Sequence, residues 1–138
     1  RMFWRTSDGS DWQRGLSLPD PVYEVTAADQ EFFVHQFPED LRATAEQLPF
    51  ALIKPPFERG MTSPAGEIWL QKSRPLLDSL RRYQVVGQDG RPKGVYVHPG
   101  DGYVIALGAD RVLVAEQHLG GVRLLQRRIP ALPLEGER

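Results

Sequence analysis

The side chains most suited to chemistry in this chain are three histidines: His35, His98 and His118. Histidine acts as a general base or as a metal ligand, and a site built on two histidines needs a third ligand. The carboxylates that stand near enough in the sequence to supply one are Asp101, Asp110 and Glu116. Their spacing matches no recognised ligand pattern, so we expect His98 and His118 to be ordinary residues of strand ends or turns. We assign no metal-binding residues.

Motifs of catalysis and cofactor binding are absent from the sequence. It contains no GxSxG nucleophile elbow, no HExxH zinc motif, no P-loop and no GxGxxG dinucleotide motif. The lack of cysteine excludes disulfides, thiolate metal sites and cysteine nucleophiles. The run HPGDGY at 98–103 lacks the closely spaced oxygen ligands of a calcium loop. We therefore assign no catalytic and no cofactor-binding residues, and a non-catalytic role is favoured over an enzyme.

The composition indicates a soluble globular chain without a strong field. The 138 residues carry a formal net charge of −1, with 41% hydrophobic and 25% charged residues. Such a balance does not recruit nucleic acid, and the basic pairs Arg81-Arg82 and Arg127-Arg128 are expected to be solvated strand ends. No apolar run reaches the length of about 18 residues that a membrane span needs. We expect no nucleic-acid partner and no transmembrane segment in this chain.

The beginning of the sequence is unusual, because translation would not start at Arg1 and a strand-like apolar run is already under way there. This pattern predicts a chain cut from a longer protein. Two short apolar-aromatic runs then flank Asp8-Gly9, which is a hairpin signal.

Residues 21–54 have the pattern of a helical insertion. Thr26 followed by Asp29 predicts a capped helix start, and Pro38 is placed as the first residue of a second short helix whose early carboxylates suit the helix dipole. The side chains expected to pack in the interior are those of Phe32, Phe33, Phe37, Trp4, Trp12 and Trp69.

The remainder of the chain reads as antiparallel strands joined by short turns. Strands are predicted at 67–71, 83–88, 94–98, 103–108, 111–117 and 122–129. The last three are apolar on both faces, which predicts strands covered on both sides by neighbouring sheets. Pro92 cannot donate to a strand ladder and Lys93 resists further pairing, so the strand after the Asp89-Gly90 turn is expected at a sheet edge.

These runs, taken in order, resemble the C-terminal blades of bacterial six-bladed β-propellers of the NHL-like type. Ala65-Gly66 followed by Ile68-Trp69-Leu70 is similar to the second strand of a blade and its turn, with Ala65 in place of the usual aspartate. Tyr83 to Val86 with Asp89-Gly90-Arg91 is similar to the third strand, and 94–99 to the outer strand. The resemblance covers residues 55–130 well and 1–20 weakly.

The resemblance implies a mainly β fold of two to two and a half antiparallel up-and-down propeller blades with a short helical insertion. Residues 1–20 would be the last two strands of a preceding blade, 21–54 the insertion, 55–100 the penultimate blade, 101–130 a three-stranded final blade and 131–138 a tail. A ring of six blades of about 40 residues needs about 240 residues, so the remaining blades or a protein partner must cover the exposed blade faces.

Three functions follow as hypotheses. The first is a non-catalytic propeller module that serves as a protein-binding, accessory or scaffold subunit of a larger assembly. The second is the C-terminal part of an NHL-like propeller enzyme of the lyase or lactonase type, with its active-site residues mostly outside this chain. The third is a stand-alone β-sandwich that binds a partner. The residues leave the compartment open, and an exported or periplasmic location is favoured only because similar propellers are often exported.

Overall fold

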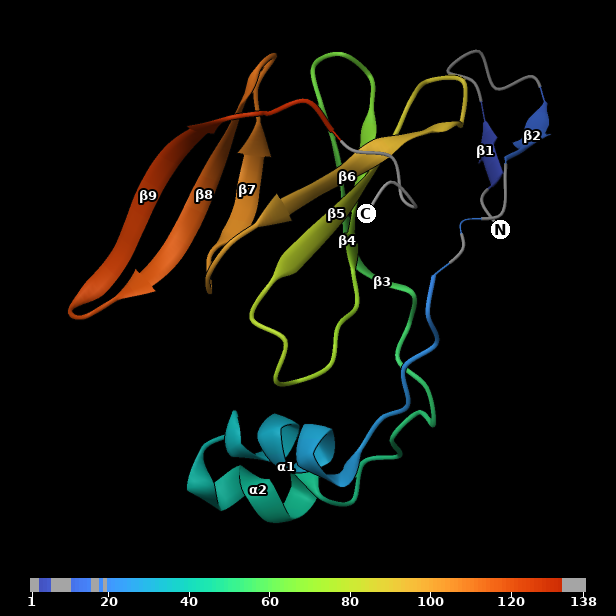
Figure 1. Ribbon diagram of the computed structural model, residues 1–138. Helices are drawn as coiled ribbons and strands as arrows, with labels where there is room; N and C mark the ends of the chain where they lie inside the picture. The colour runs from blue at the N-terminus through green and yellow to red at the C-terminus, as the bar shows by residue number, and fades with distance from the viewer. Residues whose placement is uncertain (1–2, 6–10, 16–17, 19, 133–138) are drawn as a thin grey trace.

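The computed structural model describes residues 3–5, 11–15, 18 and 20–132. This described part of the chain is mainly β, with three antiparallel sheets and two short helices (Figure 1). In chain order the elements are β1 (Phe3–Arg5), β2 (Trp12–Arg14), α1 (Ala27–His35), α2 (Glu39–Ala45), β3 (Phe57–Thr62), β4 (Ile68–Lys72), β5 (Arg81–Val86), β6 (Pro92–His98), β7 (Tyr103–Leu107), β8 (Arg111–His118) and β9 (Gly121–Arg128). Within the described part of the chain, neither helix has the length or apolar character to cross a membrane.

The N-terminal strands β1 and β2 form a two-stranded antiparallel sheet, as the flanking runs predict. The Asp8-Gly9 turn that should join them lies outside the described residues, as does the side chain of Trp4. Trp12 contradicts the expectation of an interior tryptophan, because 69% of its surface is exposed. Neither β1 nor β2 pairs with any other described strand.

The helical insertion is present where the sequence predicts it. The hydroxyl of Thr26 accepts a hydrogen bond from the backbone N–H of Asp29, and the Asp29 carboxylate accepts one from the backbone N–H of Thr26. Pro38 is the N-cap of α2 rather than its first residue, because its backbone is still extended.

The aromatic side chains of the insertion pack only in part as expected. Phe33 contacts Phe37 and Phe50 edge to face, with ring centroids 5.1 and 5.6 Å apart. Phe32 and Phe33 are 56% and 36% exposed, which corrects the prediction that both pack in the interior. The residues of the two helices that are buried are Val34 and Ala45, so the insertion has a small apolar contact of its own.

The first large sheet has the order β3-β4-β5-β6, with every neighbour antiparallel. Gly90 makes the turn between β5 and β6 with a positive φ of 72°, and Asp89 accepts a hydrogen bond from the N–H of Arg91. β6 begins at Pro92 and is an edge strand of the sheet, which confirms the prediction from Pro92 and Lys93.

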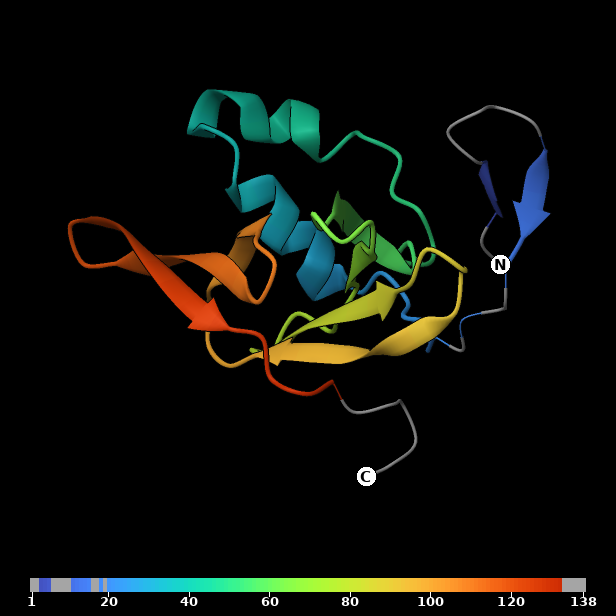
Figure 2. The ribbon, with the colours of Figure 1, turned by 90° about the horizontal axis from the view of Figure 1, so that it is seen from above.

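The second large sheet has the order β7-β8-β9 and stacks face to face on the first. Figures 1 and 2 both show the first large sheet between this second sheet and the β1–β2 hairpin. The shared core lies between the two large sheets and comprises Trp69, Tyr83, Val85, Tyr96, Val104, Val112 and Val114. Trp69 thus packs in the interior as predicted, with its ring centroid 5.4 Å from that of Tyr96.

Strand β9 departs from the sequence expectation. The two-sided apolar pattern of 122–129 predicts burial on both faces, but Val122 and Leu124 are 58% and 59% exposed. No described layer lies on the outer side of the second sheet, so the face formed by alternate residues of β9 is uncovered. The prediction of a strand covered on both sides is therefore wrong for the described chain.

Candidate functional site

A group of four interacting ionisable side chains lies at one end of the contact between the two large sheets. His98 ends β6 and its side chain is fully buried. Its Nε2 atom lies 3.5 Å from Oε1 of Glu116 on β8. Arg123 of β9 donates to the other carboxylate oxygen of Glu116 at 2.7 Å, and Arg127 of β9 lies 3.8 Å from Oε1. We call these four residues the His98 cluster.

Strand parity explains why these residues meet. His98 follows Tyr96 by two positions and Glu116 follows Val114 by two, so each points to the same face of its strand as a core residue. Glu116 and Arg123 are direct partners in the β8–β9 register and therefore share that face. The cluster thus continues the apolar core toward the end of the sheets.

The electrostatics of the cluster favour a neutral imidazole. Burial lowers the pKa of His98, the positive charge of Arg127 adds to that effect, and Glu116 opposes it. The hydrogen bond from Arg123 lowers the pKa of the Glu116 carboxyl and keeps it ionised. Neither ring nitrogen of His98 has a hydrogen-bond partner among the described residues.

The surroundings of His98 leave no room for a substrate at its Nε2 atom. A Cβ atom added to Gly102 would lie 2.6 Å from Nε2 of His98, 2.7 Å from Cγ of Glu116 and 2.7 Å from a methyl group of Val114. Gly102 therefore closes that side of the ring by direct contact of its backbone. A histidine and a carboxylate that are packed this tightly orient one another but are not placed to reach a reacting molecule.

The other residues considered from the sequence do not join this cluster. His118 is exposed at the end of β8, with Nδ1 3.3 Å from its neighbouring backbone oxygen at Leu119. Asp110 and Asp101 are exposed in turns. Across the described ranges, no three histidine or acidic side chains come close enough together to hold a metal ion.

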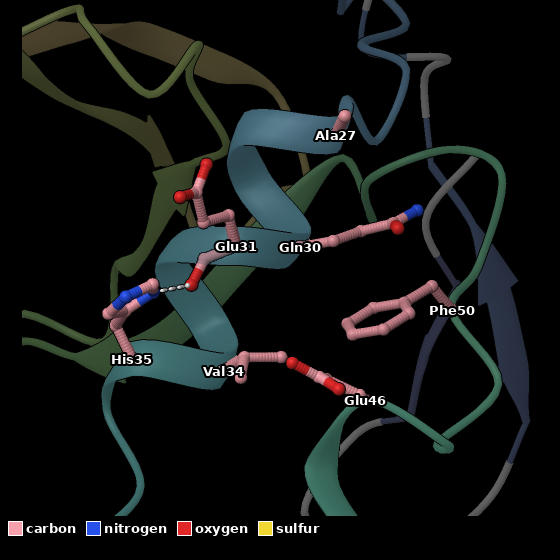
Figure 3. Close-up of a pocket in the computed structure, with 7 residues that line it drawn as sticks. All are labelled: Ala27, Gln30, Glu31, Val34, His35, Glu46 and Phe50. Carbon is pink, nitrogen blue, oxygen red and sulfur yellow. Dashed lines mark hydrogen bonds between the residues drawn. The ribbon is translucent and has the colours of Figure 1, made fainter. Parts of the chain in front are cut away.

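His35 lies instead in the insertion, beside an open cavity of about 300 Å³ between the two helices and Phe50 (Figure 3). Its Nδ1 atom is 2.8 Å from the backbone oxygen of Glu31. Figure 3 shows the carboxylate of Glu31 pointing away from Phe50, while Gln30 and Glu46 frame the ring. The volume is at the lower limit for small-molecule sites, and the groups around it present no nucleophile.

The second sheet offers an extended surface rather than a pocket. β9 is an edge strand of eight residues with Val122 and Leu124 on its outer face. Tyr103 of β7 and Leu124 of β9 both lie opposite Ala115 in the register, so they flank it on the same face. The residues of this surface match no functional motif, and the one sequence signal for it is the unbroken run of β9.

A cation–π contact and a hydrogen bond join the second large sheet to the first large sheet. The guanidinium of Arg81 lies 5.8 Å from the centre of the Tyr103 ring, and the hydroxyl of Tyr83 accepts a hydrogen bond from the backbone N–H of Val104 at 2.9 Å. Both contacts join β5 to β7. The position of the uncovered face is therefore fixed by the packing behind it.

Comparison of the chain with protein-family models, with curated proteins and with solved structures finds no match.

Proposed function

We propose that this chain is a non-catalytic β-propeller module that acts as a protein-binding or accessory part of a larger assembly. The observation that carries the proposal is the stacking of two antiparallel sheets in chain order, with an apolar face of the last sheet left uncovered. Such a face is energetically unfavourable in water unless another surface covers it. Its function is then association.

The arrangement of the strands supports blades rather than an isolated pair of sheets. The strands of each large sheet follow one another in sequence order, as in up-and-down propeller blades. The first strands of the two sheets, β3 and β7, contact each other. Blades that start side by side and stack face to face are what the resemblance to NHL-like propellers leads us to expect.

The chemistry of the described residues supports association more than catalysis. The His98 cluster contains a potential base, but packing encloses it. By contrast, the uncovered face of β9 is directly accessible, with more than half of the surface of Val122 and of Leu124 exposed. Burial of such side chains contributes about 1.5–3 kcal/mol each when complete.

The decisive experiment is the behaviour of residues 1–138 expressed alone. Light scattering coupled to size-exclusion chromatography should show association that increases with protein concentration, together with binding of a dye specific for apolar surfaces. Leu124→Gln should reduce both signals. Leu119→Gln is the matched control, because Leu119 is almost fully exposed in the β8–β9 turn rather than on the strand face.

A monomer at all concentrations, with a cooperative thermal transition and no dye binding, would contradict the proposal. That result is the one that a stand-alone β-sandwich predicts, since a complete sandwich has no face that needs covering.

A further inference from the structure

The free edge of β9 differs from the other edges of the two large sheets. β6 begins with Pro92 and Lys93, and Nζ of Lys93 forms an ion pair with Oε1 of Glu67 at 2.7 Å. The pairing of β3 is interrupted by a bulge between Phe57 and Arg59, and that of β7 by one between Val104 and Ala106. Proline, lysine and bulges are the means by which proteins prevent further strand pairing.

β9 has none of these interruptions. Its eight residues pair with β8 in continuous register from Gly121 to Arg128, and they include no proline. Among the described residues no strand pairs with its other side. An edge of this length presents a row of backbone donors and acceptors that an extended peptide can join.

The charge of β9 specifies which peptide fits. The strand carries Arg123, Arg127 and Arg128 and no acidic residue. Arg123 is neutralised by Glu116 at 2.7 Å, but Arg127 is 3.8 Å from the same carboxylate. Among the described residues Arg128 has no ion pair, and it lies directly opposite Arg111 in the register. Like charges opposite one another are unfavourable. Arg111 has an ion pair with Asp110 at 3.7 Å, so the unbalanced positive charge at this end of the sheet is that of Arg128.

The apolar residues of β9 lie at its other end. Val122, Leu124 and Leu125 occupy the first part of the strand, and the arginine pair closes it. A strand that runs antiparallel to β9 would therefore begin opposite Arg128 and Arg127 and continue past the leucines to Val122. The best complement starts with acidic residues and continues with apolar, β-branched ones.

We infer that β9 accepts an extended segment of a partner protein as an antiparallel fourth strand, and that this segment carries acidic residues followed by apolar residues. The inference rests on the proposed function and names the chemistry of the partner. A second copy of this chain fits the edge less well, because pairing β9 with itself doubles the positive charge without adding a carboxylate.

The test uses a fluorescent peptide, EETVVTVT, whose length equals that of β9. Binding is followed by fluorescence anisotropy at low ionic strength, at protein concentrations below those at which the chain associates with itself. The peptide KKTVVTVT should bind about tenfold more weakly, since two exposed charge pairs are lost. A version of EETVVTVT that is N-methylated at alternate residues should not bind, because methylation removes its main-chain donors.

The matched protein variant is Arg128→Glu, which should weaken the binding of EETVVTVT and reduce the preference for it over KKTVVTVT. Arg128 is exposed on the edge and lies outside the His98 cluster, so circular dichroism should show an unchanged fold. Hydrogen exchange should slow at 121–128 when the peptide is added.

Equal affinity for the two peptides, unchanged binding after N-methylation, or protection, without any peptide, of those amides of 121–128 that point away from β8 would each overturn the inference. The last outcome would mean that a second copy or another part of the chain occupies the edge. The proposed function fails separately, when the chain without peptide is a monomer at all concentrations and binds no dye.

Discussion

The hydroxyl of Tyr83 on β5 accepts a hydrogen bond from the backbone N–H of Val104 on β7, at 2.9 Å. The two residues belong to different sheets, and both are fully buried. The bond satisfies a backbone donor of β7 at the interface while the Tyr83 ring packs against Trp69 and Tyr96. Burial raises the pKa of the Tyr83 hydroxyl, so it stays protonated and polar at neutral pH.

Tyr83→Phe should lower the free energy of unfolding by about 1–3 kcal/mol, because it leaves the buried N–H of Val104 without an acceptor. Urea denaturation followed by tryptophan fluorescence measures the change. Tyr96→Phe, in the same aromatic group, is the control and should have a smaller effect. Equal losses in the two variants would mean that ring packing, not the hydrogen bond, accounts for the contribution of Tyr83.

Acidification should destabilise the contact between the two sheets through His98. Its pKa lies below the ordinary value of 6.5 because of burial, so the unfolded chain takes up a proton at a higher pH than the folded chain. The contribution of neutral His98 to the free energy of unfolding has its full value above about pH 6.5. It decreases as the pH falls from there through the lowered pKa, by up to about 1.4 kcal/mol per pH unit.

The measurement is the urea midpoint as a function of pH in the wild type and in His98→Gln. The variant should lose the pH dependence between neutrality and pH 5. Glu116 acts in a separate, more acidic window, because its lowered pKa makes it lose its charge only below the ordinary value of 4.5. A wild-type midpoint that does not change between pH 7 and pH 5 would contradict the role of His98.

Gly102→Ala should destabilise the chain by about 1–3 kcal/mol, as overpacking does in a tight interior. The new methyl group would lie within 2.7 Å of atoms of His98, Glu116 and Val114. Gly60→Ala on β3 is the matched control, since its methyl group would stand 3.5 Å from Leu70 in ordinary contact. The melting temperature of Gly102→Ala should be clearly lower than that of Gly60→Ala. Equal melting temperatures would show that the side chains around Gly102 accommodate the methyl group without loss of stability.

Thr26→Ala should weaken α1 by about 1 kcal/mol through loss of its cap. Hydrogen exchange of the amides of α1 should become faster, while that of β5 should be unchanged. Thr44→Ala on α2 is the control, because Thr44 is exposed and alanine is the better helix former there. Faster exchange in the control alone would contradict the importance of the capping box.

The features that the sequence predicts correctly depend on short-range chemistry. The Thr26–Asp29 capping box, the Asp89-Gly90 turn and the edge position of Pro92 each follow from the conformational properties of a few consecutive residues. The strands and their mainly β arrangement follow from alternation and turn spacing in the same way.

What the sequence does not disclose depends on what covers each surface. The pattern of residues gives Trp12 and Trp69 the same expectation, but one is exposed and the other is fully buried, because the second sheet stacks on Trp69 and no described layer stacks on Trp12. The sequence places His98 at a strand end, where it does lie. Its burial depends on the stacking of the second large sheet on the face of β6 that carries Tyr96.

The segments that lead into and out of the helical insertion pair with each other, and this affects how the protein can change over evolution. The N–H of Val25 donates to the oxygen of Leu52, and the N–H of Lys54 donates to the oxygen of Tyr23, so the chain leaves and returns at neighbouring points. A segment whose two ends are bonded to each other in this way is attached to the sheets at one place. The entropic cost of closing such a loop changes only slowly with its length. Lineages can therefore lengthen, shorten or exchange residues 26–51 while the stacked sheets keep their register.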